Sequence, residues 1–196
     1  MVWGSMFAII MGYLLGSFPS AYIAGRLLRG VDIRGVGDSN MGAANAWHEL
    51  GARAGIVVLI ADVGKGAAAM LIATVIGVSL PALLLTGLAV VAGHNWPLFL
   101  GFRGGKGAAT TFGVLLTQLP YPMLILLGVA LIPFAITRNV NLAGAFLFSP
   151  AALVAWWLDA SGALIAYSIL LPCVVGLTHF ITTRNPPLEV KERRST

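Results

Sequence analysis

Long stretches without a charged residue constrain this chain more than any other feature. Residues 1–25, 67–102, 107–137, 139–158 and 160–183 contain no Asp, Glu, Lys or Arg. A charged side chain at the centre of a spanning helix costs about 2.5–3.5 kcal/mol, so these intervals are the segments that a lipid bilayer accepts. Only 10% of the residues are charged, 58% are hydrophobic, and the mean hydropathy is +0.91. Such a composition excludes an ordinary soluble domain and a disordered chain, and it predicts an integral membrane protein.

Prolines divide the longer intervals, each of which exceeds the roughly 20 residues that one spanning helix needs. Proline disfavours a helical conformation in the residue before it and is well suited to begin a new helix, which predicts breaks at 79–81 and 119–122. We therefore expect an all-α fold of about seven transmembrane helices. Their expected ranges are 3–25, 54–78, 81–100, 107–119, 121–137, 140–158 and 162–183.

Two of these segments leave alternatives open. The segment 107–119 rises only about 20 Å as a helix, against a hydrocarbon core of about 30 Å, so it crosses fully or forms a half-span. The first segment, 3–25, is either a retained helix or a signal peptide. It lacks a basic start and continues into a patterned loop, which favours a retained helix.

The positions of the cations predict the orientation in the membrane. When the seven segments alternate in direction, one face receives eleven of the twelve Lys and Arg residues, and Lys65 lies within a helix. The positive-inside rule places that face in the cytoplasm and the N-terminus outside. We expect residues 1–185 to form one transmembrane domain and 186–196 to form a charged cytoplasmic tail. The eleven cations are Arg26, Arg29, Arg34, Arg53, Arg103, Lys106, Arg138, Arg184, Lys191, Arg193 and Arg194.

The first polar stretch, residues 35–45, is rich in glycine and in residues that cap helices. Asp38, Ser39 or Asn40 is expected to cap a helix that runs to about residue 50. The exposed N–H groups at such a helix start form an anion site. The alternative is a capped turn without a ligand.

The second polar stretch, residues 93–107, combines three closely spaced glycines with Arg103 and Lys106 just before a predicted helix. Glycines that allow close backbone approach, a lysine and a helix N-terminus together favour phosphate binding. The spacing differs from that of a P-loop, which has four residues between Gly and Gly-Lys and then Ser or Thr. The alternative is a basic turn at the membrane edge that meets lipid head groups.

Ionisable residues inside the predicted helices are few. Asp62 and Lys65 are spaced to face each other on one helix, as an ion pair or with the lysine turned toward the anion site. His94 ends a helix, where we interpret it as structural. The three histidines have no cysteine or carboxylate cluster nearby, and the single cysteine, Cys173, excludes an internal disulfide. No metal site and no Ser-His-Asp arrangement is predicted.

Over nearly its whole length the sequence resembles the bacterial integral-membrane, acyl-phosphate-dependent glycerol-3-phosphate acyltransferases. The resemblance is carried by residues 16–19, 32–34, 40–45 and 62–66, and most strongly by 93–107. This last run reads Gly-His-x-x-Pro-x-Phe-x-x-Phe-Arg-Gly-Gly-Lys-Gly and is long and specific. The family's seven-helix fold, with its active site at the cytoplasmic side, agrees with the arrangement that the charges predict.

The resemblance implies transfer of a fatty acyl group from acyl phosphate to the 1-hydroxyl of glycerol 3-phosphate. The products would be lysophosphatidic acid and orthophosphate, the first step of phospholipid synthesis. Because acyl phosphate is already activated, aligning the reactants and neutralising charge can be sufficient, and the donor's own oxygen can accept the hydroxyl proton. The expected partners are the two substrates and membrane lipids, without nucleic acid and without a cofactor. The sequence does not indicate an oligomeric state.

By position, the resemblance implies catalytic roles for Lys106, His179 and Asn40. Gly104, Gly105 and Gly107 match the phosphate-binding second motif. The full expected substrate-binding set is Ser39, Gly42, Asn45, His48, Arg103, Gly104, Gly105, Gly107 and Asn141.

The chain departs from the family pattern mainly on the acceptor side. Asp38 stands where the family has serine, Ala44 where it has threonine, and His48 where it has arginine. Phe180 and Thr182 replace the arginine and asparagine of the third motif. These changes leave three alternatives open: a paralogue with another acyl acceptor, a non-catalytic membrane protein that binds phosphate or lipid, and a transporter of small anions.

Overall fold

The computed structural model describes residues 2–184, and within that range the chain is helical without strands. The predicted tail, 186–196, lies outside the described residues. The elements are α1 (Val2–Gly16), α2 (Ser20–Arg29), η1 (Ile33–Gly35), α3 (Ala43–Leu50), α4 (Ala52–Ile76), α5 (Leu80–Asn95), η2 (Leu98–Leu100), α6 (Ala108–Gln118), α7 (Pro120–Thr137), α8 (Val140–Phe148), α9 (Ala151–Trp157) and α10 (Gly162–Arg184).

Six helical segments within residues 2–184 are long and apolar enough to cross a membrane. They are Val2–Arg29, Ala52–Ile76, Leu80–Leu100, Pro120–Thr137, Val140–Trp157 and Gly162–Thr182. The remaining predicted segment corresponds to α6, whose 11 residues rise about 17 Å. The predicted all-α membrane architecture is confirmed, whereas the count of seven spans and their orientation stay predictions.

Three helices that we expected to be continuous are broken. The expected helix 3–25 divides into α1 and α2, the expected helix 81–100 ends at Asn95 before η2, and the expected helix 140–158 divides into α8 and α9. At each break a proline lies immediately before the next element: Pro19, Pro97 and Pro150. Proline lacks the N–H that a continuous helix needs, which contributes at each break. The residue before Pro150, Ser149, nevertheless keeps helical backbone angles (φ −62°, ψ −42°).

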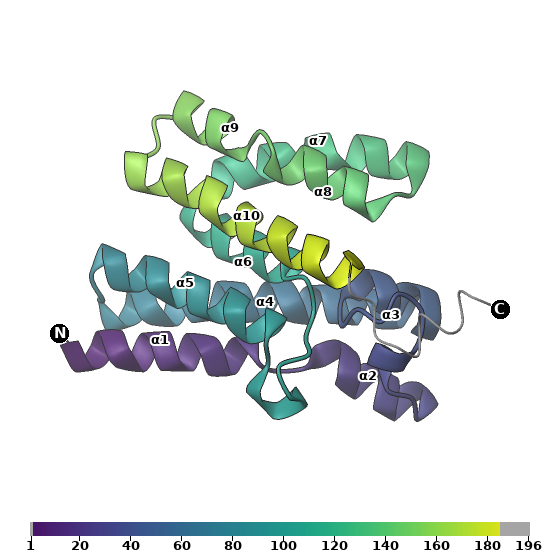
Figure 1. Ribbon diagram of the computed structural model, residues 1–196. Coiled ribbons are helices and arrows are strands. Elements are labelled where there is room, and N and C mark those ends of the chain that lie inside the picture. Colours follow the sequence, from purple (N-terminus) through teal and green to yellow (C-terminus); the bar gives the residue numbers. More distant parts are fainter. Residues whose placement is uncertain (1, 185–196) are drawn as a thin grey trace.

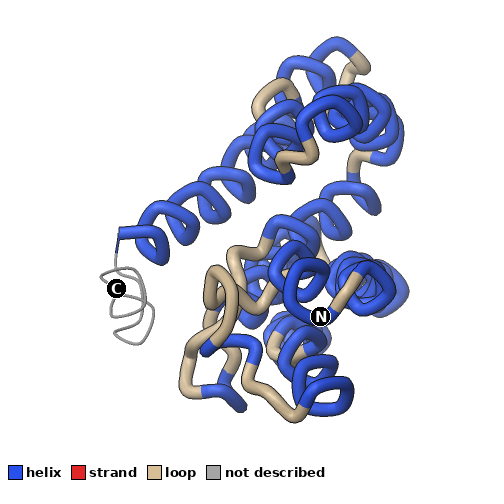
Figure 2. The backbone as a smooth tube through the Cα atoms, turned by 90° about the vertical axis from the view of Figure 1, so that its right-hand side faces the viewer, coloured by secondary structure: helices blue, strands red, loops and turns tan. Residues whose placement is uncertain are grey.

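The helices form two groups with α6 and α10 between them (Figure 1). In the lower group α1 packs against α4 and α5, and α3 packs against α4. In the upper group α7 packs against α8 and α9. Figure 2 shows α10 running obliquely from the upper group toward the loops of the lower one. Those loops carry the polar motifs, so the C-terminal end of α10 is brought toward them.

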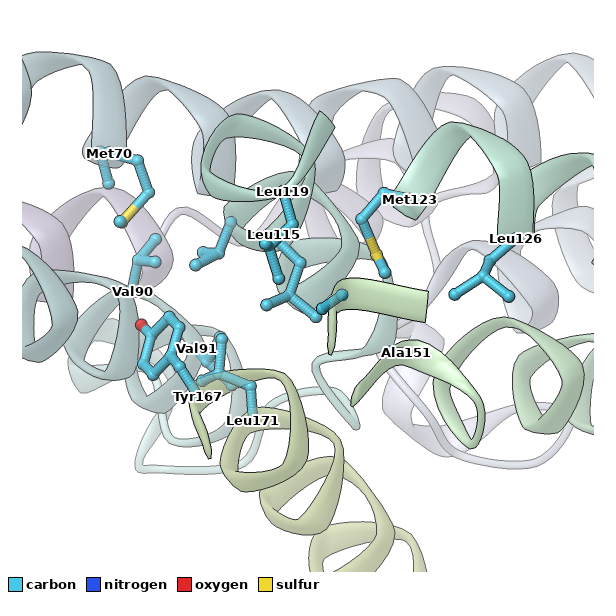
Figure 3. Close-up of a cluster of buried hydrophobic side chains, with 13 residues drawn as sticks. Met70, Val90, Val91, Leu115, Leu119, Met123, Leu126, Ala151, Tyr167 and Leu171 are labelled. Carbon is cyan, nitrogen blue, oxygen red and sulfur yellow. The ribbon is translucent and has the colours of Figure 1, made fainter. Parts of the chain in front are cut away.

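A core of buried apolar side chains joins the two groups. Met70 of α4, Leu115 of α6, Met123 of α7 and Leu171 of α10 are fully buried in one cluster (Figure 3). Tyr167 of α10 also lies there, and its hydroxyl donates a 2.8 Å hydrogen bond to the carbonyl of Leu84 in α5. This bond satisfies the one polar atom that the tyrosine carries into the core.

Small residues bring α4 and α6 into close contact. A β-carbon on Gly66 would collide with the backbone carbonyl of Thr110, and one on Gly113 would collide with that of Val63. Small residues at a helix interface allow membrane helices to approach closely and gain packing energy. The start of α6, which follows the second polar stretch, is therefore held firmly against α4.

Candidate active site

The first polar stretch forms a loop, residues 30–42, which we call the first loop. The loop folds around the buried side chain of Asn45, which belongs to α3. The Asn45 amide nitrogen donates to the carbonyls of Ile33, Val36 and Asn40 at 3.0–3.2 Å, and its oxygen accepts from the N–H of Asp38 at 3.2 Å. The amide hydrogens of this side chain and one acceptor site of its oxygen are thus used on the loop, which favours a role in shaping the site over direct contact with a substrate.

The prediction that Asp38, Ser39 or Asn40 caps the following helix is wrong. The helix α3 begins after Gly42, which provides no side-chain cap. The Asp38 carboxylate instead accepts the N–H of Asn40 at 3.1 Å, a local turn that such short acidic side chains favour. Ser39 adopts a left-handed backbone (φ 60°), and its hydroxyl oxygen is buried without a hydrogen-bond partner.

The second polar stretch forms the glycine loop, residues 101–107, which lies against the end of α5. The N–H of Gly104 donates to the carbonyl of Asn95 and that of Gly105 to the carbonyl of His94, each at 3.1 Å. A β-carbon on Gly104 or Gly105 would collide with His94, and Gly107 has a left-handed backbone (φ 85°). Only glycine fits this close approach without strain.

Lys106 connects the two loops. Its ammonium nitrogen lies 3.6 Å from Oδ2 of Asp38, and both side chains are partly exposed. His179 of α10 interacts electrostatically with both Lys106 and Asp38. The structure therefore brings together a residue from the glycine loop, one from the first loop and one from α10, which are far apart in the sequence.

A buried hydrogen bond places α10 beside the glycine loop. The side-chain amide of Asn95 donates to the hydroxyl of Thr178 at 3.0 Å, and Thr178 directly precedes His179. The Asn95 side-chain oxygen is buried without a partner, and it lies so close to Gly107 that a β-carbon there would collide with it. Sequence reasoning did not assign Asn95 or Thr178, and the only signal was that Asn95 lies inside the glycine-rich motif.

A second bridge joins the loops on the exposed side. Arg34 donates two hydrogen bonds, of 2.7 and 3.0 Å, to the two oxygens of Asp32 and a third, of 3.0 Å, to the carbonyl of Leu100. The hydrogen bonds from the Arg34 guanidinium hold the pKa of the Asp32 carboxyl below its ordinary value of 3.8. The first loop is thus fastened to η2, which leads into the glycine loop.

The predicted ion pair between Asp62 and Lys65 is present, at 2.9 Å. It lies in the interior rather than at the loop surface, and the lysine also donates to the carbonyl of Phe18 at 3.1 Å. The side chains of Ser20 and His94 approach the same carboxylate.

The remaining predicted site residues are more peripheral. Arg103, His48 and Asn141 are exposed, and within residues 2–184 none of their side chains makes a hydrogen bond or ion pair. His48 lies on α3, and Asn141 lies in the first turn of α8. The two loops and α10 thus form a cluster with a cation and a histidine. The functional roles of all the predicted site residues, Arg103, His48 and Asn141 included, stay predictions.

Comparison with known proteins identifies the family of this chain. The family described as glycerol-3-phosphate acyltransferase matches residues 6–185. Glycerol-3-phosphate acyltransferase 4 of Dehalococcoides mccartyi is 47% identical over 176 residues, which cover 90% of this chain and 95% of that protein. Glycerol-3-phosphate acyltransferase 1 of the same organism is 40% identical over 195 residues, covering 96% of this chain and 93% of that protein.

Solved structures give the same result for the fold. The crystal structure of PlsY (YgiH), an integral membrane glycerol 3-phosphate acyltransferase, in its glycerol 3-phosphate form has a TM-score of 0.84 and 34% identity, covering 92% of this chain and 90% of that one. Its lysophosphatidic acid form has a TM-score of 0.81 and 33% identity, with the same coverage. Together with the apolar helices, these likenesses show a multi-pass membrane protein that belongs to the glycerol-3-phosphate acyltransferase family.

Proposed function

We propose that this acyltransferase moves a fatty acyl group from acyl phosphate to the 1-hydroxyl of glycerol 3-phosphate. The hydroxyl oxygen bonds to the acyl carbonyl carbon, the bond from that carbon to the phosphate oxygen breaks, and the hydroxyl proton passes to the departing phosphate. Lysophosphatidic acid and orthophosphate result. The observation that carries the proposal is the cluster of Lys106, the glycine-loop backbone and His179 in a chain of this family.

The site suits two phosphorylated substrates. The N–H groups of Gly104 and Gly105 donate to carbonyls at the end of α5. The Lys106 ammonium and the N-terminus of α6, which begins directly after the loop, are the groups that would bind phosphoryl oxygens and stabilise charge that develops during transfer. In this proposal Lys106 neutralises the donor phosphate, and His179 together with the first loop binds the acceptor. The predicted site residues form the set to be tested, with Lys106, His179 and Asn40 in contact with the reacting groups.

The proposal places the site on the cytoplasmic side. In Figure 1 the N-terminus lies at the left, whereas α2, α3 and the turn from α7 to α8 lie at the right. Arg26 and Arg29 belong to α2, and Arg138 belongs to the turn from α7 to α8, so these cations support that assignment through the positive-inside rule.

The direct test is orthophosphate release from palmitoyl phosphate by purified protein, with and without glycerol 3-phosphate. We expect release that depends on glycerol 3-phosphate, accompanied by lysophosphatidic acid, and we expect the Lys106→Ala variant to lack it. Failure of glycerol 3-phosphate to stimulate release would refute the proposal.

One observation favours a second candidate, a transferase with a different acceptor. The negative charge of Asp38 lies beside Lys106, where a phosphorylated acceptor would meet repulsion. A panel of uncharged and amino alcohols in the same assay distinguishes the candidates, because the second one requires an acceptor that stimulates release more than glycerol 3-phosphate does.

A further inference from the structure

Four polar side chains meet in the interior beside the glycine loop, and the proposed transfer uses none of them. They are Ser20 of α2, Asp62 and Lys65 of α4, and His94 of α5. Oδ1 of Asp62 accepts from Oγ of Ser20 at 2.7 Å and lies 2.9 Å from Nζ of Lys65 and 3.6 Å from Nδ1 of His94. The side chains of Asp62, Lys65 and His94 are 1%, 7% and 5% exposed, so this is a buried network rather than a surface ion pair.

Burying charged groups costs free energy, and buried charges are retained only where partners compensate their lost hydration. Three groups converge on one oxygen of Asp62, while Lys65 also donates to the carbonyl of Phe18 at the break between α1 and α2. The side chains of Asp62, Lys65 and His94 are buried, so in this proposal the network affects the reaction through the groups that it holds in place.

His94 is the member that reaches the glycine loop. Its backbone carbonyl accepts the N–H of Gly105 at 3.1 Å, and its Nε2 lies so close to Gly105 that a β-carbon there would collide with it. The next carbonyl, that of Asn95, accepts the N–H of Gly104. The imidazole ring is therefore the surface on which this part of the loop lies, immediately before Lys106.

We propose that Asp62 and His94 are positioning residues for the phosphate-binding loop. Asp62, held by Lys65 and Ser20, orients the imidazole of His94, and the imidazole fixes the backbone at Gly105. Lys106 and the N-terminus of α6, which follow this part of the loop, then face the phosphoryl oxygens of the acyl donor. This inference rests on the proposed function and extends it. It states that a network without substrate contact determines the affinity for the acyl donor.

Two substitutions of His94 test the contacts of its two ring nitrogens separately. An asparagine amide lies near the position of Nδ1 and keeps the contact with Asp62, whereas a glutamine amide extends to the position of Nε2 and keeps the contact with Gly105. We expect His94→Asn to raise the KM for palmitoyl phosphate by about tenfold and His94→Gln by less, because only the asparagine removes the surface under the loop. The KM for glycerol 3-phosphate and kcat should stay within about twofold. An equal rise in both KM values, or none, overturns the proposal.

A paired exchange distinguishes positioning from stability. Replacing both members of a buried ion pair by apolar residues is commonly tolerated, whereas removing one leaves an uncompensated charge. We therefore expect Asp62→Leu/Lys65→Met to fold and still to raise the KM for palmitoyl phosphate, because His94 has lost its carboxylate. The matched control is Thr86→Val in α5, the helix of His94, which removes a buried hydroxyl that donates a hydrogen bond to the carbonyl of Ala82. A double variant with the wild-type KM would refute the positioning role.

A binding measurement keeps this inference separate from the proposed function. Inorganic phosphate, which suits the same loop, should raise the Tm of the wild-type protein by mass action. The rise should be smaller in His94→Asn and in Asp62→Leu/Lys65→Met, but unchanged in Thr86→Val. This pattern without acyl transfer would refute the proposed function and support the inference. Acyl transfer with an equal phosphate shift in all the variants would refute the inference alone.

Discussion

The two polar loops of this acyltransferase are held in different ways. The glycine loop lies on the end of α5, with two backbone hydrogen bonds and the buried imidazole of His94 beneath it. The first loop depends on the side chain of Asn45 and on the partly exposed pair of Asp32 and Arg34. The loop expected to bind the acyl donor therefore packs on buried groups. The loop expected to bind the acceptor is held partly by exposed side chains. This difference parallels the sequence, in which the departures from the family lie mainly on the acceptor side.

The largest effect should come from Lys106→Ala, which removes the cation between the two loops. Deleting one preorganised group that stabilises developing charge typically lowers kcat by about 100- to 1000-fold, and we expect a loss of that order in orthophosphate release. The control is Arg53→Ala, which removes an exposed cation from the start of α4. Equal losses in the two variants would indicate a general effect of surface charge instead of a specific site.

Gly105→Ala should produce the next largest effect, about 10- to 100-fold in kcat/KM for palmitoyl phosphate. The added β-carbon would collide with His94, so the loop must move away from its position, and misplacement of about 1 Å can lower activity about 100-fold. Gly64→Ala is the matched control, because nothing lies within 4 Å of a β-carbon there. That variant should keep its activity, and a similar loss in both variants would contradict a tightly packed loop.

Asn45→Ala tests how the first loop is held. It leaves the carbonyls of Ile33, Val36 and Asn40 without their common donor, which should lower the free energy of unfolding by about 1–3 kcal/mol and raise the KM for glycerol 3-phosphate. Thermal unfolding in detergent and steady-state kinetics provide the two measurements. If the KM for palmitoyl phosphate rises more than that for glycerol 3-phosphate, the division of labour between the loops is wrong.

Asp38→Ser should have a smaller effect, in the opposite direction. The carboxylate, which lies beside Lys106, places a negative charge in the loop expected to bind the acceptor. Its removal should relieve repulsion of the acceptor phosphate and lower the KM for glycerol 3-phosphate severalfold. The serine hydroxyl retains an acceptor for the N–H of Asn40. Asp159→Asn, in the turn before α10, is the control for lost negative charge. An unchanged or higher KM in Asp38→Ser would mean that the carboxylate does not oppose the acceptor.

The smallest expected effect is the pH dependence of the bridge formed by Asp32 and Arg34. Because folding lowers the pKa of Asp32 below 3.8, this carboxylate stabilises the fold at pH values above 3.8, and its contribution is lost as the pH falls through the folded-state value. Wild type should therefore be more stable than Asp32→Asn at neutral pH, with a difference that shrinks below pH 3.8. Unfolding curves across that range measure it, and a difference independent of pH would exclude the linkage.

The sequence predicts the membrane segments well, because the absence of charge is a local property that needs no knowledge of the fold. It does not predict continuity within a segment. The breaks before Pro19 and Pro150 lie inside stretches without a charged residue, so the absence of charge does not mark where the helix ends. Prolines divided the intervals at 79–81 and 119–122 in our prediction, but proline alone is not a sufficient criterion, because Pro133 and Pro172 lie inside α7 and α10 without ending them.

The site is only partly visible in the sequence. The glycine loop could be predicted because its glycines and lysine are contiguous. By contrast, Asp38 meets Lys106, and Asn95 meets Thr178, across long separations in the chain. Nothing local in the sequence marks such pairs, since they depend on how the helices cross. Asp38 could be recognised as an unusual residue, but its partner could not be identified.

The hydrogen bond between Asn95 and Thr178 fixes the rotation of α10 about its own axis. Because successive residues of an α-helix are about 100° apart around its axis, this bond sets the angular phase at which α10 presents His179 to the glycine loop. Inserting one alanine between Pro172 and Thr178 would leave the helix long enough to cross the bilayer. It would rotate the last two helical turns by about 100° around the helix axis. The helix would still insert in the membrane, yet His179 would face a different direction, so catalytic competence and membrane integration would become separable properties of the same segment.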